Sequence, residues 1–313
     1  NIETKCWDKE LLELFEIPKN ILPKVKKSMA NFGLAKINTL SIPIQGVSGD
    51  QQAALFGQGC VGAGSSKCTY GTGLFYLFNT GMKRIDSTNG LLTTLALDKD
   101  GNPVYAIEGS VFIGGAVIQW IRDELGLIKN ASETQDIALS IVNTEGVYIV
   151  PAFVGLGAPY WNSDSKGVIT GLTRGSNKKH IIRAAVESIA YQVNDLLSCI
   201  KKDTKKMPKQ LNVDGGATNN EFLLQFQADI SNIEIIKPSN IESTALGAGI
   251  LAGVKNGFWD TVDKPFEYKT IDKKYIPKMK ISERKKLRLL RLLNMFPNFA
   301  DMLKIYKNIQ NID

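Results

Sequence analysis

Short runs of apolar and β-branched residues predict an antiparallel group of strands in the first third of the chain. Strands are expected at 67–70, 74–78, 91–97 and 104–107, each rich in Tyr, Thr, Val or Leu. The polar turn 98–102 joins the last two as a hairpin. These four strands therefore begin a sheet of which neighbouring members run in opposite directions.

After this group the apolar spacing alternates between helical and strand periods. Residues 181–201 place Ile182, Ala185, Ile189, Val193 and Leu196 on one stripe, as in a long amphipathic helix. Further helices are expected at 111–125, 134–140, 221–230 and 244–254, and further strands at 147–153, 168–173, 210–213 and 233–236. An antiparallel start followed by alternating strands and helices predicts an α/β protein with a mixed sheet and helices packed on it.

The two ends of the chain differ from this middle part. Helix 8–15, strand 42–47 and a helical segment at 50–59 lead into a glycine-rich junction at 57–66, and 259–277 reads as an extended, charged connector. We therefore expect three parts: residues 1–60, residues 61–258, and residues 259–313.

Composition narrows the class of protein. The hydrophobic fraction is 43% and the charged fraction is 22%, as in soluble globular proteins. Four cysteines without CxxC spacing and a single histidine, His180, exclude a His/Cys zinc cluster and predict free thiols in a reducing compartment. No apolar run is long enough for a membrane span, and no signal peptide opens the chain, so a cytoplasmic protein is expected.

The net charge of +7 lies entirely near the C-terminus. Residues 262–313 contain 13 Lys and Arg against 6 Asp and Glu, including the run ERKKLRLLRLL. Such a run is compatible with an arm for RNA or a membrane surface. The interpretation favoured here is the solvated basic face of an amphipathic terminal helix, with no nucleic-acid partner.

Three glycine-rich turns are candidates for ligand contact. Tyr70–Gly73 lies between two strands, so backbone N–H groups and the Thr72 hydroxyl can approach an anion. Asp214–Asn220 lies between a strand and a helix, where exposed N–H groups favour a phosphate. Glu108–Ser110, with Gly114 and Gly115 in the next helix, is the third. Each is individually a common connector, but three in one sheet favour a phosphate-containing ligand.

Asp50 follows a Ser-Gly pair at the end of an apolar segment, and Gln51 and Gln52 follow it. An aspartate in a turn often bonds only to its own backbone. Phosphoryl transfer, however, requires a carboxylate near the attacking hydroxyl or the metal, and amides suit polyol hydroxyls. A P-loop is absent, and the GxGxxG match at 57–62 follows a helical segment rather than a strand, so neither common nucleotide motif applies.

Long segments of the sequence closely resemble the FGGY family of carbohydrate kinases, and within it the members that phosphorylate glycerol. The resemblance runs from about residue 6 to about residue 260 and is carried by GVSGDQQAALFGQ, KCTYGTGLFYLFNTG, AIEGSVFIGGAVIQWIRDEL, GVITGLTRGSNKKHIIRAAVESIAYQ and VDGGATNNEFLLQFQADI. It implies an actin-like ATPase fold of the ribonuclease-H type, in which a mixed sheet is flanked by helices.

The resemblance also implies roles for individual residues and for cofactors. Asp50 corresponds to the catalytic base that also contacts glycerol, and Gln51 to a glycerol-binding residue. ATP, with Mg, would contact five residues of the second domain: Thr72, Gly115, Gln119, Gly216 and Asn220. The implied reaction is the ATP-dependent phosphorylation of glycerol to sn-glycerol 3-phosphate.

The first part of the family pattern, including half of its polyol pocket, is not found in the sequence. We therefore expect the end of the first kinase domain and the whole second domain, forming a homo-oligomer when complete. Three alternatives remain open: a non-catalytic nucleotide-binding remnant, a kinase of another polyol or sugar, and a nucleic-acid binder acting through the basic tail.

Overall fold

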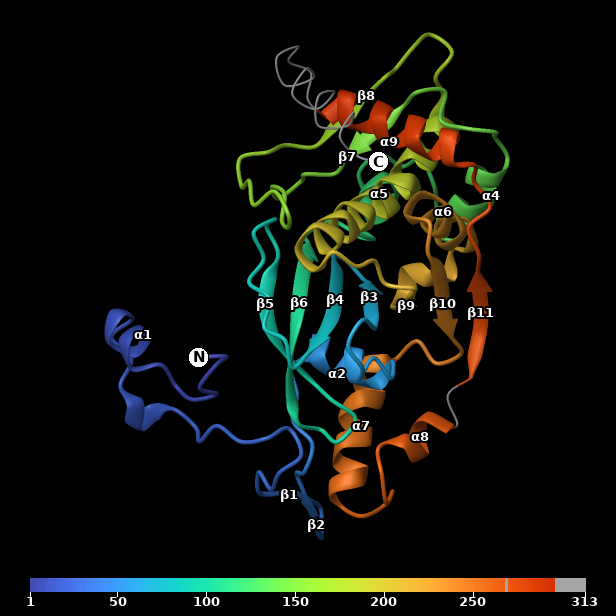
Figure 1. Ribbon diagram of the computed structural model, residues 1–313. Coiled ribbons are helices and arrows are strands. Elements are labelled where there is room, and N and C mark those ends of the chain that lie inside the picture. Colours follow the sequence, from blue (N-terminus) through green and yellow to red (C-terminus); the bar gives the residue numbers. More distant parts are fainter. Residues whose placement is uncertain (268–269, 296–313) are drawn as a thin grey trace.

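A seven-stranded mixed sheet forms the centre of the molecule (Figure 1). The computed structural model describes residues 1–267 and 270–295. The strand order is β11-β10-β9-β3-β4-β6-β5; β3, β9 and β10 run parallel to one another, and the other neighbours are antiparallel. The strands are β3 (Ser66–Tyr70), β4 (Leu74–Gly81), β5 (Leu92–Leu97), β6 (Pro103–Val111), β9 (Gln210–Asp214), β10 (Glu234–Pro238) and β11 (Ile271–Tyr275). The predicted mixed sheet with an antiparallel start is confirmed.

Helices cover both faces of this sheet. In Figure 1, α5, α6 and α9 gather at one end of the view and α2, α7 and α8 at the other. Helix α5 contacts β4 and β6, whereas α2 contacts β3, β4 and β5. The helices are α2 (Asp50–Gly57), α3 (Ala116–Asp123), α4 (Glu133–Leu139), α5 (Lys178–Thr204), α6 (Glu221–Ser231), α7 (Ser243–Lys255), α8 (Asp263–Glu267) and α9 (Ile281–Met295).

The sheet has a separate hydrophobic core on each face, because successive side chains of a strand point to opposite faces. On β4, Tyr76 and Phe78 belong to the large core beneath α5 and α6. Leu77, between them, packs with Leu55 of α2 in a smaller core on the other face. The same rule places Cys68 of β3 in the large core, and it therefore directs the neighbouring Lys67 toward α2.

Helix α5 is the main support of the large core. It begins at a capping box in which the Asn177 side chain accepts from the Lys179 N–H and Nδ1 of His180 accepts from the Asn177 N–H. Ile182, Ile189 and other residues of the predicted stripe are buried. The lone histidine is therefore a helix cap. None of the helices in residues 1–267 and 270–295 is long and apolar enough to cross a membrane.

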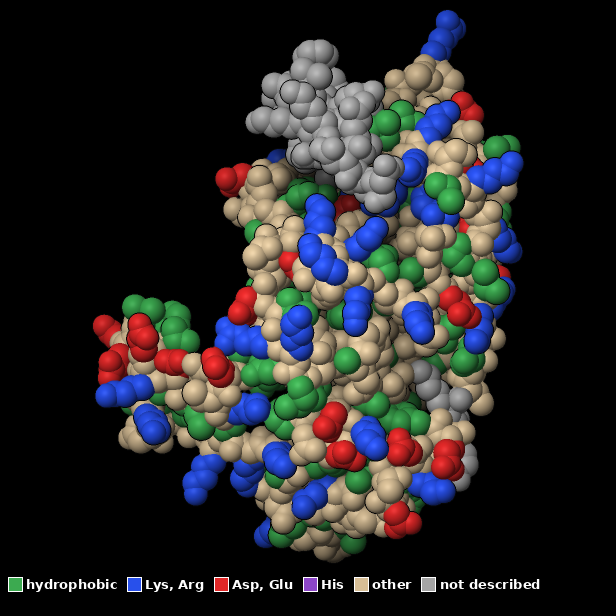
Figure 2. Space-filling model, in the orientation of Figure 1, with side chains coloured by type: hydrophobic (Ala, Val, Ile, Leu, Met, Phe, Trp, Pro, Cys, Tyr) green, Lys and Arg blue, Asp and Glu red, His purple; other side chains and the backbone are tan. Residues whose placement is uncertain are grey.

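The first 47 residues form an arm that extends away from the sheet (Figure 1). It contains α1 (Lys9–Leu14), a 3₁₀ turn (Lys19–Ile21) and a hairpin of β1 (Leu34–Ile37) and β2 (Leu40–Pro43). Apolar side chains are visible on this arm in Figure 2, and the exposed ones include Leu14, Phe15, Ile21 and Leu34. The predicted strand 42–47 forms only in its first two residues, because the hairpin turn at Asn38 pairs residues 40–43 with residues 34–37.

Two other predictions need correction. Glu108–Ser110 is not a turn but lies within β6, paired with β4, and Gly109 has no room for a Cβ because Leu196 lies 2.8 Å from that position. The segment 259–277 is not simply a connector, because it contains α8 and the edge strand β11. A small separate sheet pairs β7 (Tyr148–Val150) with β8 (Val168–Thr170) in antiparallel fashion. The strands predicted at 147–153 and 168–173 therefore form, but each is shorter than expected.

The basic residues of α9 hold this helix against the body of the protein. Arg291 is buried and forms an ion pair with Asp195 of α5 at 2.7 Å. Arg284 donates to the carbonyl of Asp229, and Arg288 donates to Ser198 Oγ. The expected solvated basic face therefore describes this helix only in part. Residues 296–313 of the predicted tail lie outside the described residues.

Candidate nucleotide site and the carboxylate beside it

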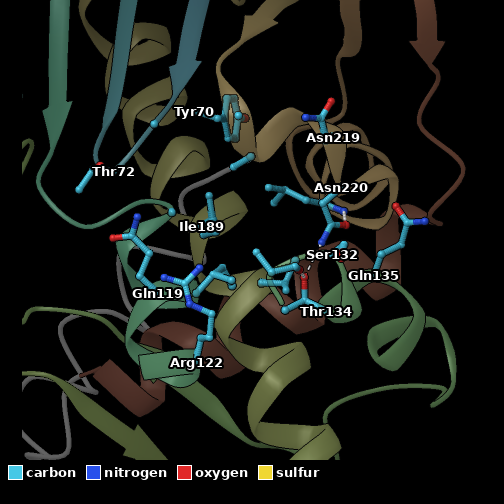
Figure 3. Close-up of a pocket in the computed structure, with 18 residues that line it drawn as sticks. Tyr70, Thr72, Gln119, Arg122, Ser132, Thr134, Gln135, Ile189, Asn219 and Asn220 are labelled. Carbon is cyan, nitrogen blue, oxygen red and sulfur yellow. Dashed lines mark hydrogen bonds between the residues drawn. The ribbon is translucent and has the colours of Figure 1, made fainter. Parts of the chain in front are cut away.

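A cavity of about 540 Å³ opens where β3 and β9 end (Figure 3). Figure 3 shows Thr72 and Gln119 on one side of it and Asn219, Asn220 and Gln135 on the other. Parallel strands present their carboxyl ends at the same edge of a sheet, and ligands of α/β proteins bind there. The lining residues are Tyr70, Gly71, Thr72, Gly115, Ile118, Gln119, Arg122, Ala131, Ser132, Thr134, Gln135, Val186, Ile189, Gly216, Ala217, Asn219, Asn220 and Leu223.

The first wall is the β3–β4 turn, which is fixed by the start of α3. The carbonyl of Thr72 accepts from the Gly114 N–H at 2.7 Å and from the Ala116 N–H at 3.1 Å. The carbonyl of Gly71 accepts from the Gly115 N–H at 2.8 Å. A Cβ on Gly115 would lie only 2.8 Å from that carbonyl oxygen. The glycine pair therefore allows two backbones to meet, and it precedes α3 rather than lying inside it.

The second wall is the turn after β9. Gly215 has φ +88°, and a Cβ there would lie 2.7 Å from the Tyr70 carbonyl oxygen, so this position requires glycine. Asn220 begins α6 by accepting from the Leu223 N–H at 3.0 Å. Its Nδ2 donates to Thr134 Oγ1 at 3.0 Å, which ties α6 to α4 across the cavity mouth.

The cavity combines an apolar floor with a polar rim. Ile118, Val186, Ile189 and Leu223 supply aliphatic surface suited to the faces of a flat ring. The rim carries Asn219, from the predicted turn Asp214–Asn220, together with hydroxyl, amide and guanidinium groups that sequence reasoning missed: Arg122, Ser132, Thr134 and Gln135. Nothing in the sequence marks them, because they come from two helices and a loop that meet the glycine turns only in the folded chain.

The cavity therefore unites all five residues predicted to contact a nucleotide: Thr72, Gly115, Gln119, Gly216 and Asn220.

Asp50 and Gln51 do not line the cavity. They begin α2, on the opposite face of β3, and Asp50 is exposed. One Asp50 carboxylate oxygen accepts from the backbone N–H of Gln51 at 2.8 Å, and the other accepts from Gln51 Nε2 at 3.3 Å. The Gln51 side chain in turn accepts a hydrogen bond from Lys67 Nζ. The carboxylate and the cavity thus lie on two sides of the same strand.

A second carboxylate lies at the end of β9, on the face that α2 covers. Asp214 is buried, and its Oδ2 accepts from Gln58 Nε2 at 3.2 Å. Its Oδ1 has no hydrogen-bond partner among the described residues. Within residues 1–267 and 270–295, no group of three or more His, Cys, Asp and Glu side chains could hold a metal ion. Any cation here would therefore depend on a ligand for most of its coordination.

Comparison with known proteins gives a consistent result. The C-terminal domain pattern of the FGGY family of carbohydrate kinases matches residues 66–255, and the N-terminal domain pattern matches residues 1–57. The chain is 54% identical over 291 residues to glycerol kinase of Shewanella amazonensis and 52% identical over 289 residues to that of Shewanella pealeana. These alignments cover 92% of this chain and 59% of each relative, so the chain spans about three fifths of the length of these relatives.

Solved structures agree with these matches. The crystal structure of Plasmodium falciparum glycerol kinase with ADP matches with a TM-score of 0.84 and 37% identity, covering 99% of this chain and 60% of that one. A ligand-bound xylulose kinase from Lactobacillus acidophilus matches with a TM-score of 0.81 and 25% identity, covering 96% and 62%. The seven-stranded mixed sheet flanked by helices has the actin-like ATPase fold of these kinases. By sequence pattern, by identity and by fold, this chain belongs to the FGGY family of carbohydrate kinases.

Proposed function

We propose that the complete polypeptide transfers the γ-phosphoryl group of Mg-ATP to a primary hydroxyl of glycerol, giving sn-glycerol 3-phosphate and ADP. The observation that carries the proposal is the cavity at the ends of β3 and β9, which gathers the five residues expected to contact a nucleotide. The identity of 54% to a glycerol kinase supports the choice of glycerol.

The nucleotide would lie in this cavity. Its purine ring fits the aliphatic floor around Ile189, and the asparagine side chains near the start of α6 supply amides for the base and sugar. The phosphates would point toward Thr72, where the Gly71–Gly73 turn offers backbone and hydroxyl donors without an intervening Cβ. Such preorganised donors stabilise the charge of a transferring phosphoryl group.

Asp50 is proposed as the base. Its carboxylate is solvent-exposed, and among the described residues its hydrogen bonds come from Gln51 alone, so it is free to accept a proton from a substrate hydroxyl. The hydroxyl oxygen would form the new bond to phosphorus while the bond to the ADP oxygen breaks. Gln51, beside it, would bind a polyol hydroxyl through its amide.

The residues present fit one Mg²⁺ bound together with ATP. Mg²⁺ usually takes one or two carboxylates, waters and substrate phosphates rather than an all-protein cage. Asp214 adjoins the Gly215–Gly216 turn, and its buried Oδ1 has no hydrogen-bond partner in the part of the chain that the structure describes. It is the residue that would hold the ion, directly or through water. When bound, the ion would neutralise negative charge on the phosphates.

The nucleotide site is tested by titrating the chain with ADP. Gln119→Glu adds a negative charge at the cavity rim and is expected to weaken ADP binding about 5- to 10-fold, because like charges a few ångströms apart repel by about 1 kcal/mol even in water. Asn143→Asp is the matched control, since it adds the same charge outside the cavity. Equal affinities for the two variants would place the nucleotide elsewhere.

The assignment of the base is tested in the complete polypeptide by following ADP release with glycerol. Asp50→Asn is expected to lower kcat by about 10²- to 10⁴-fold, the usual contribution of a general base. ADP affinity should stay unchanged, because Asp50 lies outside the cavity. Turnover close to that of the wild type would show that another group takes the proton.

The same assay separates the other possible functions. Phosphorylation of a different polyol or sugar in preference to glycerol would identify a kinase of another substrate, and ADP binding without any transfer would identify a non-catalytic nucleotide-binding protein. A cytoplasmic location and a homo-oligomeric state are further proposals, to be checked by fractionation of cells and by light scattering.

A further inference from the structure

Lys67 is a buried lysine on β3 with an unusual set of neighbours. Its exposed fraction is 0%, and burying a charged side chain is costly unless it is paired. Among residues 1–267 and 270–295, no carboxylate lies within ion-pair distance of its ammonium group. Burial lowers the pKa of Lys67, and the more distant charges of Asp214 and Glu108 oppose this shift. The amino group is thus held in the interior by hydrogen bonds and by distant charges rather than by an ion pair with a described carboxylate.

The contacts of Lys67 lead toward the proposed base. Its Nζ donates to Thr69 Oγ1 at 2.8 Å and to Oε1 of Gln51. Gln51 Nε2 donates to Asp50 Oδ2 at 3.3 Å, and the Gln51 backbone N–H donates to Asp50 Oδ1 at 2.8 Å. The lysine and the carboxylate are therefore joined by one amide group.

The direction of these bonds fixes the orientation of that amide. A lysine ammonium group is a donor without acceptor capacity, so only the oxygen of the Gln51 amide can face it. The NH₂ group then faces the Asp50 carboxylate, which needs a donor. Without Lys67, the amide oxygen loses this donor, and only the bond from Nε2 to Asp50 Oδ2 at 3.3 Å restrains the amide, so the side chain can rotate away from the carboxylate.

We propose that Lys67 is a positioning residue, which orients the Gln51 amide and through it holds the Asp50 carboxylate in the direction required for proton transfer. This inference rests on the proposed function, in which Asp50 is the base. Lys67 lies beneath α2 and does not line the nucleotide cavity. It would therefore affect proton transfer from the polyol hydroxyl rather than the binding of the nucleotide.

The test is a double-mutant cycle in the complete polypeptide with Lys67→Met and Gln51→Met. Lys67→Met keeps an unbranched side chain, one atom shorter, and removes the donor. We expect kcat to fall on the order of 10- to 100-fold, because small displacements of a reacting group have effects of this size. If Lys67 acts through Gln51, adding Lys67→Met to Gln51→Met should change kcat less than twofold. Independent, multiplicative effects would overturn the proposal.

Two further measurements exclude a general structural effect and remove the dependence on activity. ADP affinity of Lys67→Met should equal that of the wild type, and its urea midpoint should be equal or higher, because the substitution removes a buried amino group. A lower urea midpoint would assign a structural role to Lys67 and overturn the proposal. The side-chain amide resonances of Gln51, measured by NMR in the 313-residue chain, should move in Lys67→Met toward those of a solvent-exposed glutamine. Unchanged resonances would refute the proposal even if the protein phosphorylated no polyol, whereas that failure alone would refute only the proposed function.

Discussion

The contact between α2 and α7 is made by glycines, and it determines where Asp50 lies. A Cβ on Gly247 of α7 would be 1.9 Å from the carbonyl oxygen of Ala53 and 3.0 Å from the backbone nitrogen of Gly57, both in α2. A Cβ on Gly57 would be 2.2 Å from the carbonyl oxygen of Ser243. The two backbones therefore touch without side chains between them, and any added methyl group must move one helix.

Gly247→Ala is the sharpest perturbation of this contact. A carbon atom and a carbonyl oxygen approach to about 3.3 Å at closest, so α2 and α7 would have to separate by roughly 1 Å or more. Overpacking of this kind costs about 3 kcal/mol at the upper end of its usual range, and the better helix propensity of alanine returns about 1 kcal/mol. We expect the free energy of unfolding to fall by about 2 kcal/mol.

Gly249→Ala provides a control within the same helix. A Cβ at this exposed position would meet no atom within 4 Å, so only the propensity gain of about 0.5–1 kcal/mol is expected. Urea unfolding of the 313-residue chain, followed by circular dichroism, should separate the two variants by about 3 kcal/mol with similar m-values. Equal stabilities for Gly247→Ala and Gly249→Ala would refute the argument that this contact cannot adjust.

The same variant should separate catalysis from nucleotide binding. Because α2 begins with Asp50, a displacement of about 1 Å is expected to lower kcat of the complete polypeptide by about 10²-fold. ADP affinity should not change, since neither α2 nor α7 lines the cavity.

Three further predictions concern other parts of the structure. Asn220→Ala removes both the cap of α6 and the bond to Thr134, so urea unfolding should show a loss of about 1 kcal/mol together with weaker ADP binding; an unchanged ADP affinity would contradict the placement of the nucleotide. Burial raises the pKa of Glu187 from 4.5 to about 7 against the lowering effect of Arg183, so the folded state binds more protons than the unfolded state between these values, and this stabilising contribution is present at low pH and lost as pH rises through about 7. The stability of Glu187→Gln, measured by urea unfolding from pH 5 to pH 8, should therefore fall less with pH than that of the wild type, and parallel curves would contradict the shift. Arg291→Ala leaves Asp195, a half-buried carboxylate, without its ion-pair partner and with the Tyr160 hydroxyl as a remaining donor, and thermal unfolding should show destabilisation of about 3 kcal/mol; a change below 1 kcal/mol would mean that water replaces the guanidinium.

Local sequence signals predicted the elements well where packing agrees with them. The stripe of α5, with its Asn177 cap, and the strands β3, β4, β9 and β10 follow directly from apolar spacing and turn residues. Predictions from apolar spacing were wrong where a segment distant in sequence decides the local conformation. Gly109 suggested a turn, but pairing with β4 keeps it within a strand, and β11 forms because the edge of β10 is available to it.

The sequence alone predicted two glycine turns that line the cavity, Tyr70–Gly73 and Asp214–Asn220, and marked Asp50 as a candidate base, because backbone freedom and ionisable groups are properties of single residues and their neighbours. It could not reveal that Arg122, Thr134 and Gln135 complete the cavity, since these residues approach Thr72 and Gly216 only when α3 and α4 pack against α5. Nor could it show that Asp50 lies on the opposite face of β3 from the cavity, joined to the strand through Gln51 and Lys67. The physical reason is that a side chain's type is written in the sequence, whereas its direction and its partners depend on strand pairing and helix packing between segments far apart in the chain.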